Sequence, residues 1–415
     1  MELNTQKIVL ITSGQPSLNP RLVKEADALV DRGYEVTVIY QYWNEWATEL
    51  DKELLPLKKW KTIRVGGDPF KEKTTYWWSR LKLKIGQKLI HLLGFNYNLA
   101  ELSIGRCTFE LLNEAKRNEA ALYIAHNLAA LPAAIAAAQK FNVKCGFDAE
   151  DLHRYETSSN DLDLQVRVKA YIEEKYFKQT DYLTTSSFGI AQKYQQLFPS
   201  LKFKVILNVF PKANIKDRTH SNQILKLFWF SQSIGLSRGI QDIFGALKTI
   251  QDFNIEFHLL GDLNDSVKQV LENNIKSLHF SSPPKIIYHA PISSDELFEF
   301  AAQFDIGLAT EPSFSINNDL ALSNKIFTYI QSGLAVITSA TTAQKAFMLQ
   351  YPNMGQVYQS KNTADLANAI TKYLVEPDLL KTHQNQAKLN AQKILNWEIE
   401  KEKFLTIISD TLRKN

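Results

Sequence analysis

The chain has 415 residues, 45% of them hydrophobic and 22% charged, and its formal net charge is +4. This length exceeds what a single hydrophobic core usually holds, so we expect two globular domains of ordinary composition. Two cysteines, Cys107 and Cys145, are too few for a disulfide framework or a cysteine-based zinc site, which favours a reducing compartment such as the cytoplasm. The polar first residues are unlike a signal peptide, and no apolar run of about 18 residues predicts a membrane-spanning helix.

Strands and helices are predicted to alternate along the first half of the chain. Residues 7–12 are typical of a buried strand, 20–32 of a helix with Pro at its start and Gly33 after its end, and 35–40 of a second strand. A crossover of this kind joins parallel strands. The further strands expected in this half are 121–125, 143–147, 181–186 and 203–207, with helices such as 128–140 and 162–178 between them.

The same alternation restarts in the second half. The predicted strands there are 225–231, 255–261, 285–289, 305–309, 334–339 and 355–359, and the first helix between them covers 239–250. Two successive runs of this kind indicate two doubly wound α/β domains with parallel sheets. The division is expected near 208–217, a polar segment that contains a proline.

Ligands of an open parallel sheet bind beyond the carboxyl ends of its strands, so the residues after each strand are the candidates for function. Gly14 follows the first strand, where it allows a ligand to approach the backbone or forms a plain tight turn. His126 follows residues 121–125, either to transfer a proton or as a structural histidine. Asp148 and Glu150 follow the next strand, either to position a hydroxyl or a base, or to cap a helix.

Cations occupy two such positions in the second half. Arg238 and Gly239 end the loop after residues 225–231 and open a helix. An arginine beside exposed helix N–H groups is suited to clamp a diphosphate, and the alternative is a solvent-exposed side chain. Lys325 lies in the first turn of a helix that Ser323 is expected to cap, where a cation opposes the helix dipole unless an anion such as a phosphate is near.

Several segments, in order along the chain, resemble the retaining glycosyltransferases of family four, which share the GT-B fold. Residues 126–134 (HNLAALPAA) are similar to the family's H-D-x-x-x-L-P segment, and 147–156 (FDAEDLHRYE) to its D-x-H-E stretch. Residues 229–243 (WFSQSIGLSRGIQDI) resemble the opening of its second domain. The most specific match is 323–339 (SNKIFTYIQSGLAVITS), which resembles the family's N-K-x-x-E-Y-x-x-x-G-x-P-V-I-x-S segment.

The resemblance implies two Rossmann-like doubly wound domains that face each other across a cleft. It implies an acceptor-side domain over 1–208, a nucleotide-sugar domain over 209–385, and a helix over 386–415 that crosses back to the first domain. The catalytic candidates are His126, Asp148 and Glu150. The donor-binding candidates are Gly14, Gln15, Ser231, Gln232, Arg238, Gly239, Gly261, Asp262, Glu311, Asn324, Lys325 and Thr328.

Within that set, the resemblance assigns individual roles. Gly14 would lie near the donor phosphates, His126 near the reacting sugar, and Arg238 on the diphosphate. Glu311 and Lys325 would line the donor pocket.

The chain departs from the family pattern at positions linked to activity. The family often carries two glutamates, eight positions apart, that hold the donor sugar and the ribose, and the matching positions here are Leu320 and Thr328. The family's first-domain histidine falls at Glu150, and its second-domain Gly-Arg pair falls at Ser231 and Gln232. The fold expectation does not depend on these residues, but the identity of the nucleotide and the activity itself do.

No metal or other cofactor is expected. Asp161 and Asp163 match the D-x-D pattern that binds metal in other glycosyltransferases, but they precede a polar helix and are interpreted as its cap. No histidine and cysteine cluster suggests zinc. Arg238, Lys325 and helix N–H groups would therefore meet the charge of the leaving group.

Residues 57–95 form a basic segment with ten basic and two acidic residues. Large apolar residues recur within it at helical spacing, at Trp78, Leu81, Ile85, Leu89 and Leu92. A basic amphipathic helix of this kind suits an anionic membrane surface, and the alternative is a helix that packs its apolar face on the first domain. The residues proposed for the membrane or acceptor side are Trp77, Trp78, Arg80, Lys82, Lys84 and Lys88. Nucleic acid is not an expected partner.

The leading hypothesis is a glycosyltransferase that moves a hexose from a nucleotide-sugar donor to a hydroxyl of a carbohydrate or lipid-linked acceptor. Assembly of a surface polysaccharide or glycolipid is the expected setting, in the cytoplasm or at the inner face of the membrane. Two alternatives stay open: a sugar-nucleotide epimerase of the same fold, and a non-catalytic partner that keeps the fold without the chemistry.

Overall fold

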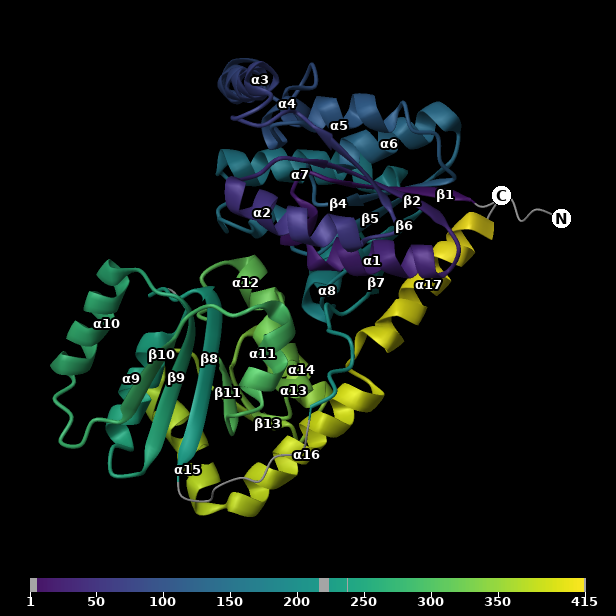
Figure 1. Cartoon of the computed structure of the whole chain (residues 1–415). Coiled ribbons are helices and arrows are strands. Elements are labelled where there is room, and N and C mark those ends of the chain that lie inside the picture. Colours follow the sequence, from purple (N-terminus) through teal and green to yellow (C-terminus); the bar gives the residue numbers. More distant parts are fainter. Residues whose placement is uncertain (1–5, 216–223, 237, 414–415) are drawn as a thin grey trace. The chain divides into compact units, whose positions relative to one another are not determined.

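The computed structural model describes residues 6–215, 224–236 and 238–413, and the chain divides into two compact units (Figure 1). Unit 1 comprises Met1–Leu207 together with Lys401–Asn415, and unit 2 comprises Asn208–Glu400. Residues 216 and 217 of the predicted boundary segment, and Ser237 of the loop before Arg238, lie outside the described residues.

The described part of unit 1 contains a parallel sheet of seven strands in the order β3-β2-β1-β4-β5-β6-β7. Chain order and spatial order diverge between β1 and β4, which are neighbours in the sheet although two strands separate them in sequence. The strands are β1 (Lys7–Thr12), β2 (Glu35–Gln41), β3 (Lys61–Val65), β4 (Leu122–His126), β5 (Lys144–Ala149), β6 (Tyr182–Thr185) and β7 (Phe203–Val205).

Helices connect these strands and cover the sheet (Figure 1). The first begins where the sequence predicts, because Pro20 occupies its first turn and the Asn19 side chain accepts a hydrogen bond from the Leu22 amide at 2.9 Å. The helices are α1 (Pro20–Asp31), α2 (Glu45–Leu54), α3 (Lys73–Leu93), α4 (Leu99–Ile104), α5 (Thr108–Ala115), α6 (Leu131–Phe141), α7 (Leu164–Tyr176) and α8 (Phe188–Leu197), with 3₁₀ turns η1 (Pro16–Leu18), η2 (Leu55–Leu57), η3 (His153–Tyr155) and η4 (Phe177–Gln179).

The described part of unit 2 contains a parallel sheet of six strands in the order β10-β9-β8-β11-β12-β13, with the switch between β8 and β11. The strands are β8 (Leu225–Ser233), β9 (Ile255–Asp262), β10 (Lys285–His289), β11 (Ile306–Ala309), β12 (Ala335–Ser339) and β13 (Gly355–Tyr358). The helices are α9 (Ile240–Thr249), α10 (Asp265–Ser277), α11 (Ser294–Ala301), α12 (Ile316–Leu320), α13 (Asn324–Gln331), α14 (Thr342–Gln350), α15 (Thr363–Val375), α16 (Pro377–Lys393) and α17 (Trp397–Arg413), the last of which continues into unit 1.

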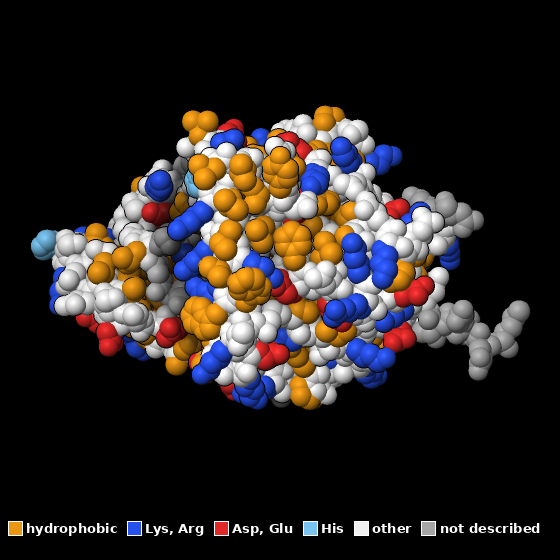
Figure 2. Space-filling model, turned by 90° about the horizontal axis from the view of Figure 1, so that it is seen from above, with side chains coloured by type: hydrophobic (Ala, Val, Ile, Leu, Met, Phe, Trp, Pro, Cys, Tyr) orange, Lys and Arg blue, Asp and Glu red, His pale blue; other side chains and the backbone are white. Residues whose placement is uncertain are grey.

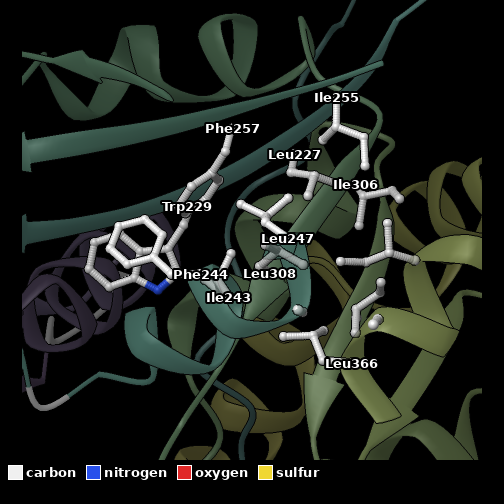
Figure 3. Packing of buried hydrophobic residues seen from close by; sticks show 14 of the residues in the cluster. Leu227, Trp229, Ile243, Phe244, Leu247, Ile255, Phe257, Ile306, Leu308 and Leu366 are labelled. Carbon is white, nitrogen blue, oxygen red and sulfur yellow. The ribbon is translucent and has the colours of Figure 1, made fainter. Parts of the chain in front are cut away.

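A continuous apolar core lies on one face of the unit 2 sheet (Figure 3). Phe244 from α9 meets Phe257 from β9 edge to face, with ring centroids 6.1 Å apart. Trp229 from β8 is completely buried in the same cluster. This packing fixes the carboxyl ends of β8 and β11, where the candidate residues of unit 2 lie.

Two features differ from the sequence prediction. Strand β3 was not predicted, because it is a short edge strand whose Lys61 and Arg64 give it the polarity of a loop. The single helix predicted over 386–415 is also wrong: α16 ends at Lys393 and α17 begins at Trp397. The Asn396 side chain causes this break, because it accepts from the Ile399 amide at 3.1 Å and donates back to the Ala391 carbonyl at 2.8 Å.

Helix α17 takes part in both units. Its first residues belong to unit 2, where the Trp397 amide donates to the Phe210 carbonyl at 2.8 Å. From Lys401 onward it belongs to unit 1, where Glu402 forms an ion pair with Arg32 at 2.7 Å and the side chains of Phe404 and Ile408 are buried.

Candidate active site

The switch point of the unit 1 sheet brings together the ends of β1, β4 and β5. Thr12, His126 and Asp148 lie side by side in register across these three strands. Asn127, which adopts a positive φ of 61°, closes the edge: its side-chain oxygen accepts from the Ser13 amide at 3.0 Å, and its side-chain nitrogen donates to Thr12 at 3.0 Å. In doubly wound sheets, ligands bind at such a switch point.

Asp148 is fully buried and is held by an arginine that the sequence analysis missed. Arg21 of α1 binds it with both ends of the guanidinium, from Nε at 2.5 Å and from Nη2 at 2.8 Å. Thr184 donates to the same carboxylate at 2.6 Å, and a third donor of Arg21 reaches the Ile206 carbonyl at 2.5 Å. This bidentate geometry is the strongest that an arginine and a carboxylate form.

His126 lies beside this pair and has no exposed surface. Its Nε2 is 3.2 Å from Glu25 of α1, and its Nδ1 is 3.6 Å from both Asp148 and Glu150. Burial disfavours the charged imidazole, but the charge of Glu25 and the nearby carboxylates of Glu150 and Asp148 outweigh it and raise the pKa of His126 to about 10. At neutral pH the ring is therefore a buried cation, not a free base.

The neighbouring acids respond to the same charges in opposite directions. Burial opposes ionisation of Asp148, yet the positive charges of Arg21 and His126 hold its pKa below the usual range. Burial and the charge of Asp148 raise the pKa of Glu25. Arg21, Glu25, His126 and Asp148 thus form one buried charge network behind the strand ends.

Of the three predicted catalytic residues, only Glu150 reaches open space. Its side chain is 27% exposed and lines a cavity of about 190 Å³ at the switch point. His153 and Glu156 line the same cavity and are joined by a 2.5 Å contact, which, with Lys169, overcomes burial and lowers the pKa of Glu156 to about 2. His126 and Asp148 lie behind Glu150, where they support it.

The loop after β1 contributes Gly14 and Gln15 to this cavity. Gln15 is almost fully buried, and its amide is held from both ends: it donates to Asp51 at 2.8 Å and accepts from the Trp43 amide at 2.8 Å. Gln15 therefore lines the site with a side chain that is held in one orientation.

The sequence carries a signal for Arg21 and Glu25 that the analysis did not use. They sit four residues apart on α1, among the buried Leu22, Ala26 and Leu29 of the same helix. A charged pair within an apolar stripe indicates a buried partner elsewhere in the fold.

Glu25, His126 and Asp148 also form the one group of possible metal ligands found among the described residues, with ligand atoms within 4.8 Å of one another. Their chemistry fits a metal poorly, because Arg21 already occupies Asp148 and His126 itself carries the compensating charge. Of the D-x-D pair, Asp163 caps α7 by accepting from the Gln165 amide at 2.8 Å, as predicted, and Asp161 accepts from the Tyr155 hydroxyl at 2.6 Å.

In unit 2 the switch point brings the loop before α9 against the end of β11. Gly239 has a φ of 74°, and a Cβ there would lie 2.6 Å from the Thr310 carbonyl oxygen, so the position requires glycine. The Thr310 hydroxyl donates to the Arg238 carbonyl at 2.9 Å. The Arg238 side chain is exposed at the start of α9.

Behind Arg238 lies a buried ion pair. Lys325 donates to Glu311 at 2.8 Å and lies 5.3 Å from the centre of the Trp229 ring. Ser323 occupies the N-cap position of α13 as predicted, but its hydroxyl donates to Glu311 at 2.9 Å and makes no capping hydrogen bond. Glu311 of the same chain is thus an anionic partner of Lys325.

Burial and the surrounding charges act on both members of this pair. Burial opposes the ionised form of Glu311, but Lys325, Ser323 and Arg238 lower its pKa. Burial lowers the pKa of Lys325, Glu311 counters this effect, and Arg238 adds to it. Arg238 is therefore close enough to act electrostatically on both members of the pair.

The remaining predicted donor residues differ in exposure. Gln232, Asp262 and Asn324 are exposed at the ends of β8 and β9 and at the start of α13. Gly261 lets β9 approach β8, because a Cβ there would lie 2.2 Å from the Ser231 carbonyl oxygen. Thr328 is completely buried and donates within its own helix at 3.3 Å, so it does not face open space.

The basic helix predicted in unit 1 is α3, and its aromatic stripe faces outward. Trp77, Trp78 and Leu92 are 57%, 59% and 81% exposed, whereas Tyr76 and Ile90 are buried on the opposite side. Figure 2 shows the face on which α3 lies, with hydrophobic side chains gathered across its middle and Lys and Arg among them. Of the predicted stripe, Trp78, Leu81, Ile85 and Leu92 are thus exposed, whereas Leu89 packs against the buried cluster of Ile90, Leu99 and Val168.

The basic residues of α3 differ in their surroundings. Lys82 forms an ion pair with Glu110, and Arg80 lies over the rings of Tyr76 and Trp77. Lys84 and Lys88 are exposed. Nowhere in the described residues does a helix combine the length and apolarity needed to cross a bilayer.

The similarity of this chain to known proteins lies in its structure. No family model matches the sequence, and no curated protein matches it either.

Solved structures match the chain over nearly its whole length. Anabaena HepE in complex with UDP shares 13% identity at a TM-score of 0.69, over 98% of this chain and 100% of that one. Sucrose-phosphate synthase from Thermosynechococcus elongatus shares 13% identity at a TM-score of 0.69, over 99% and 100%. A glycosyltransferase from Rickettsia africae shares 14% identity at a TM-score of 0.67, over 99% and 100%. With its two doubly wound parallel sheets, the chain thus has the GT-B fold of these glycosyltransferases.

Proposed function

We propose that this protein is a glycosyltransferase that moves a hexosyl group from a nucleoside-diphosphate sugar to a hydroxyl of an acceptor. Support comes from the fold that it shares with HepE, which was solved with UDP and with UDP-glucose. At 13% identity this likeness concerns the fold, so the argument for activity rests on the residues at the strand ends.

The observation that carries the proposal is the charge arrangement at the unit 2 switch point. Arg238 is exposed at the N-terminus of α9, while Lys325 is neutralised by Glu311 behind it. The group as a whole keeps one positive charge, next to the unpaired N–H groups of a ten-residue helix. A diphosphate is the ligand that suits such a position.

In the proposed reaction, the bond between the anomeric carbon and the diphosphate oxygen breaks, and a bond to the acceptor oxygen forms. The acceptor proton passes to solvent or to the departing phosphate. Arg238 and the α9 N–H groups stabilise the charge that develops on the leaving group. Glu150, supported by His126, is the polar side chain of unit 1 that we propose to orient the acceptor hydroxyl.

Retention of anomeric configuration rests on the resemblance to family four. Independence from metal is supported by Arg21, which holds both oxygens of Asp148 and leaves them little capacity for an ion. The proposed setting is the assembly of a surface polysaccharide or glycolipid in the cytoplasm.

We propose that α3 attaches unit 1 to an anionic membrane surface. Its exposed face combines Trp77 and Trp78 with Lys84 and Lys88, and side chains of this kind insert into and bind the lipid headgroup region. Co-sedimentation with vesicles of phosphatidylglycerol and phosphatidylcholine tests this at low and high salt. Trp77→Ala with Trp78→Ala should abolish binding, and failure of the unaltered protein to bind at low salt contradicts the attachment.

A non-catalytic partner protein is the second candidate, and the residues at positions 320 and 328 favour it. The family's glutamates are replaced there by Leu320 and by the buried Thr328. Such a protein would bind a nucleotide sugar and leave it intact. An epimerase would convert the bound sugar without an acceptor.

Calorimetry with UDP, GDP and ADP tests the proposal. One nucleotide should bind, and Arg238→Ala should lower its affinity by about 10-fold to 100-fold, because a hydrogen bond to a charged group contributes about 1.5–3 kcal/mol. Lys268→Ala is the matched control, since it removes an exposed positive charge of the same unit from α10. Equal affinity of both variants and the unaltered protein would refute the role of Arg238.

A further inference from the structure

A second cavity in unit 1, of about 750 Å³, adjoins the site described above. It lies beside β2 and β3, under α2, η2 and the loop that leads to α3. Its size falls within the range of small-molecule sites. The residues that line it are Gln15, Tyr40, Tyr42, Glu45, Thr48, Glu49, Asp51, Lys52, Leu55, Pro56, Thr62, Arg64, Asp68, Phe70 and Lys71.

Aromatic rings and fixed polar groups alternate around this cavity. Tyr40, Tyr42 and Phe70 supply the rings. Asp51 is held by Gln15 at 2.8 Å, and Asp68 accepts from the Phe70 amide at 2.8 Å as well as from the Arg64 side chain at 2.7 Å. These hydrogen bonds hold the carboxylates in place before any ligand arrives.

The hydroxyl of one largely buried side chain stays available to a ligand. Tyr40 is only 8% exposed, and its hydroxyl makes no hydrogen bond within the described residues. Because Tyr40 lines the cavity, its hydroxyl suits a ligand that both donates and accepts hydrogen bonds.

The charge of the lining selects the class of ligand. Four acidic side chains, Glu45, Glu49, Asp51 and Asp68, face three basic ones, Lys52, Arg64 and Lys71. A phosphate or another polyanion would meet a slight excess of negative charge here. An uncharged saccharide suits the lining better, because its C–H face packs on aromatic rings while its hydroxyls bond to carboxylates and amides.

The two cavities of unit 1 share one wall. Gln15 lines the larger cavity and also the smaller one that contains Glu150. A saccharide in the larger cavity would therefore have its end next to the switch point. We propose that the larger cavity binds an uncharged oligosaccharide, the part of the acceptor that lies beyond the reacting sugar. The inference that this oligosaccharide is the acceptor rests on the proposed function, whereas the inference that the cavity binds a saccharide does not.

Saturation-transfer NMR on the full chain tests the proposal with defined probes: maltotriose and N,N′,N″-triacetylchitotriose as uncharged sugars, and trigalacturonic acid as an acidic one. At least one uncharged sugar should bind, and UDP should not displace it. Thr62→Trp should abolish the signal, because Thr62 lines the cavity on the edge strand β3. Lys61→Trp is the matched control: Lys61 is the neighbouring residue, it points to the other face of the strand, and it pairs with Glu35 at 2.8 Å.

Tyr40→Phe provides a second variant that removes a single oxygen. It should weaken the binding of the sugar by about twofold to tenfold, as the loss of one neutral hydrogen bond predicts. Binding of the acidic sugar alone, displacement by UDP, absence of any signal, or a signal unchanged in Thr62→Trp would each overturn the inference. Calorimetry with UDP on the same samples separates the two proposals: nucleotide binding without sugar binding refutes this site only, and sugar binding without nucleotide binding refutes only the proposed activity.

Discussion

Raising the pH should weaken unit 1 through His126. Because its folded pKa of about 10 lies above the 6.5 of an ordinary histidine, the folded unit keeps a proton that the unfolded chain releases between these values. The stabilisation is complete below pH 6.5 and is lost as the pH rises toward 10. At about 1.4 kcal/mol per pH unit, His126 by itself contributes a loss of a few kcal/mol over this window. Lys24 of α1 offsets part of this loss, because burial and the charge of Arg21 lower its pKa to about 7, so that the folded unit releases a proton that the unfolded chain keeps.

Two measurements check this prediction. Histidine NMR should show a ring that stays protonated at pH 8 and whose resonance is missing from His126→Gln. Hydrogen exchange followed by mass spectrometry, corrected for the intrinsic pH dependence, should show protection of β4 changing less favourably from pH 7 to pH 9.5 in the unaltered protein than in His126→Gln, while β11 of unit 2 serves as the internal reference.

A charge-removing variant connects the effect to its cause. Glu25→Gln removes the carboxylate 3.2 Å from Nε2 and should lower the pKa of His126, so that protection of β4 is lost at lower pH. Asp31→Asn makes the same change of charge at an exposed position of the same helix and should leave the profile unaltered. A His126 ring that titrates near 6.5 in the unaltered protein would refute the reasoning.

Two further predictions concern unit 2. Gly239→Ala should destabilise it by about 1–3 kcal/mol in thermal unfolding, because a side chain is strained at a φ of 74° and would clash with Thr310, whereas Gly235→Ala, with nothing within 4 Å of the new Cβ, should cost little. Lys325→Ala should cost about 3–5 kcal/mol, since it leaves Glu311 buried without its partner. Adding Glu311→Gln should restore part of that loss, and strictly additive effects in this double-mutant cycle would show that the two side chains are not coupled.

The order of strands and helices could be predicted from the sequence because buried parallel strands are apolar along their whole length. Residues 7–12 and 335–339 are examples, and every residue of β12 is buried. Strand β3 was missed for the opposite reason: it lies at the edge of its sheet, and Lys61 and Thr62 are exposed.

The candidate site was harder to predict because its contacts join distant segments. Arg21 and Asp148 are 127 positions apart, and nothing local in either segment indicates the pair. The partner of Lys325 illustrates the same limit. The sequence places a cation unfavourably at the start of a helix, but only the fold shows that it pairs with Glu311, 14 positions earlier. Local patterns predict elements, whereas tertiary packing decides which charges meet.

Helix α17 makes the assembly of unit 1 depend on the order of synthesis. Residues up to Leu207 leave the ribosome long before Lys401, with all of unit 2 made in between. Until Phe404 and Ile408 arrive, the surface that buries them stays open to water and to chaperones. Unit 1 is thus translated first but completed last. A nonsense codon near position 400 would therefore leave unit 1 incomplete, although nearly all of its residues precede unit 2 in the sequence.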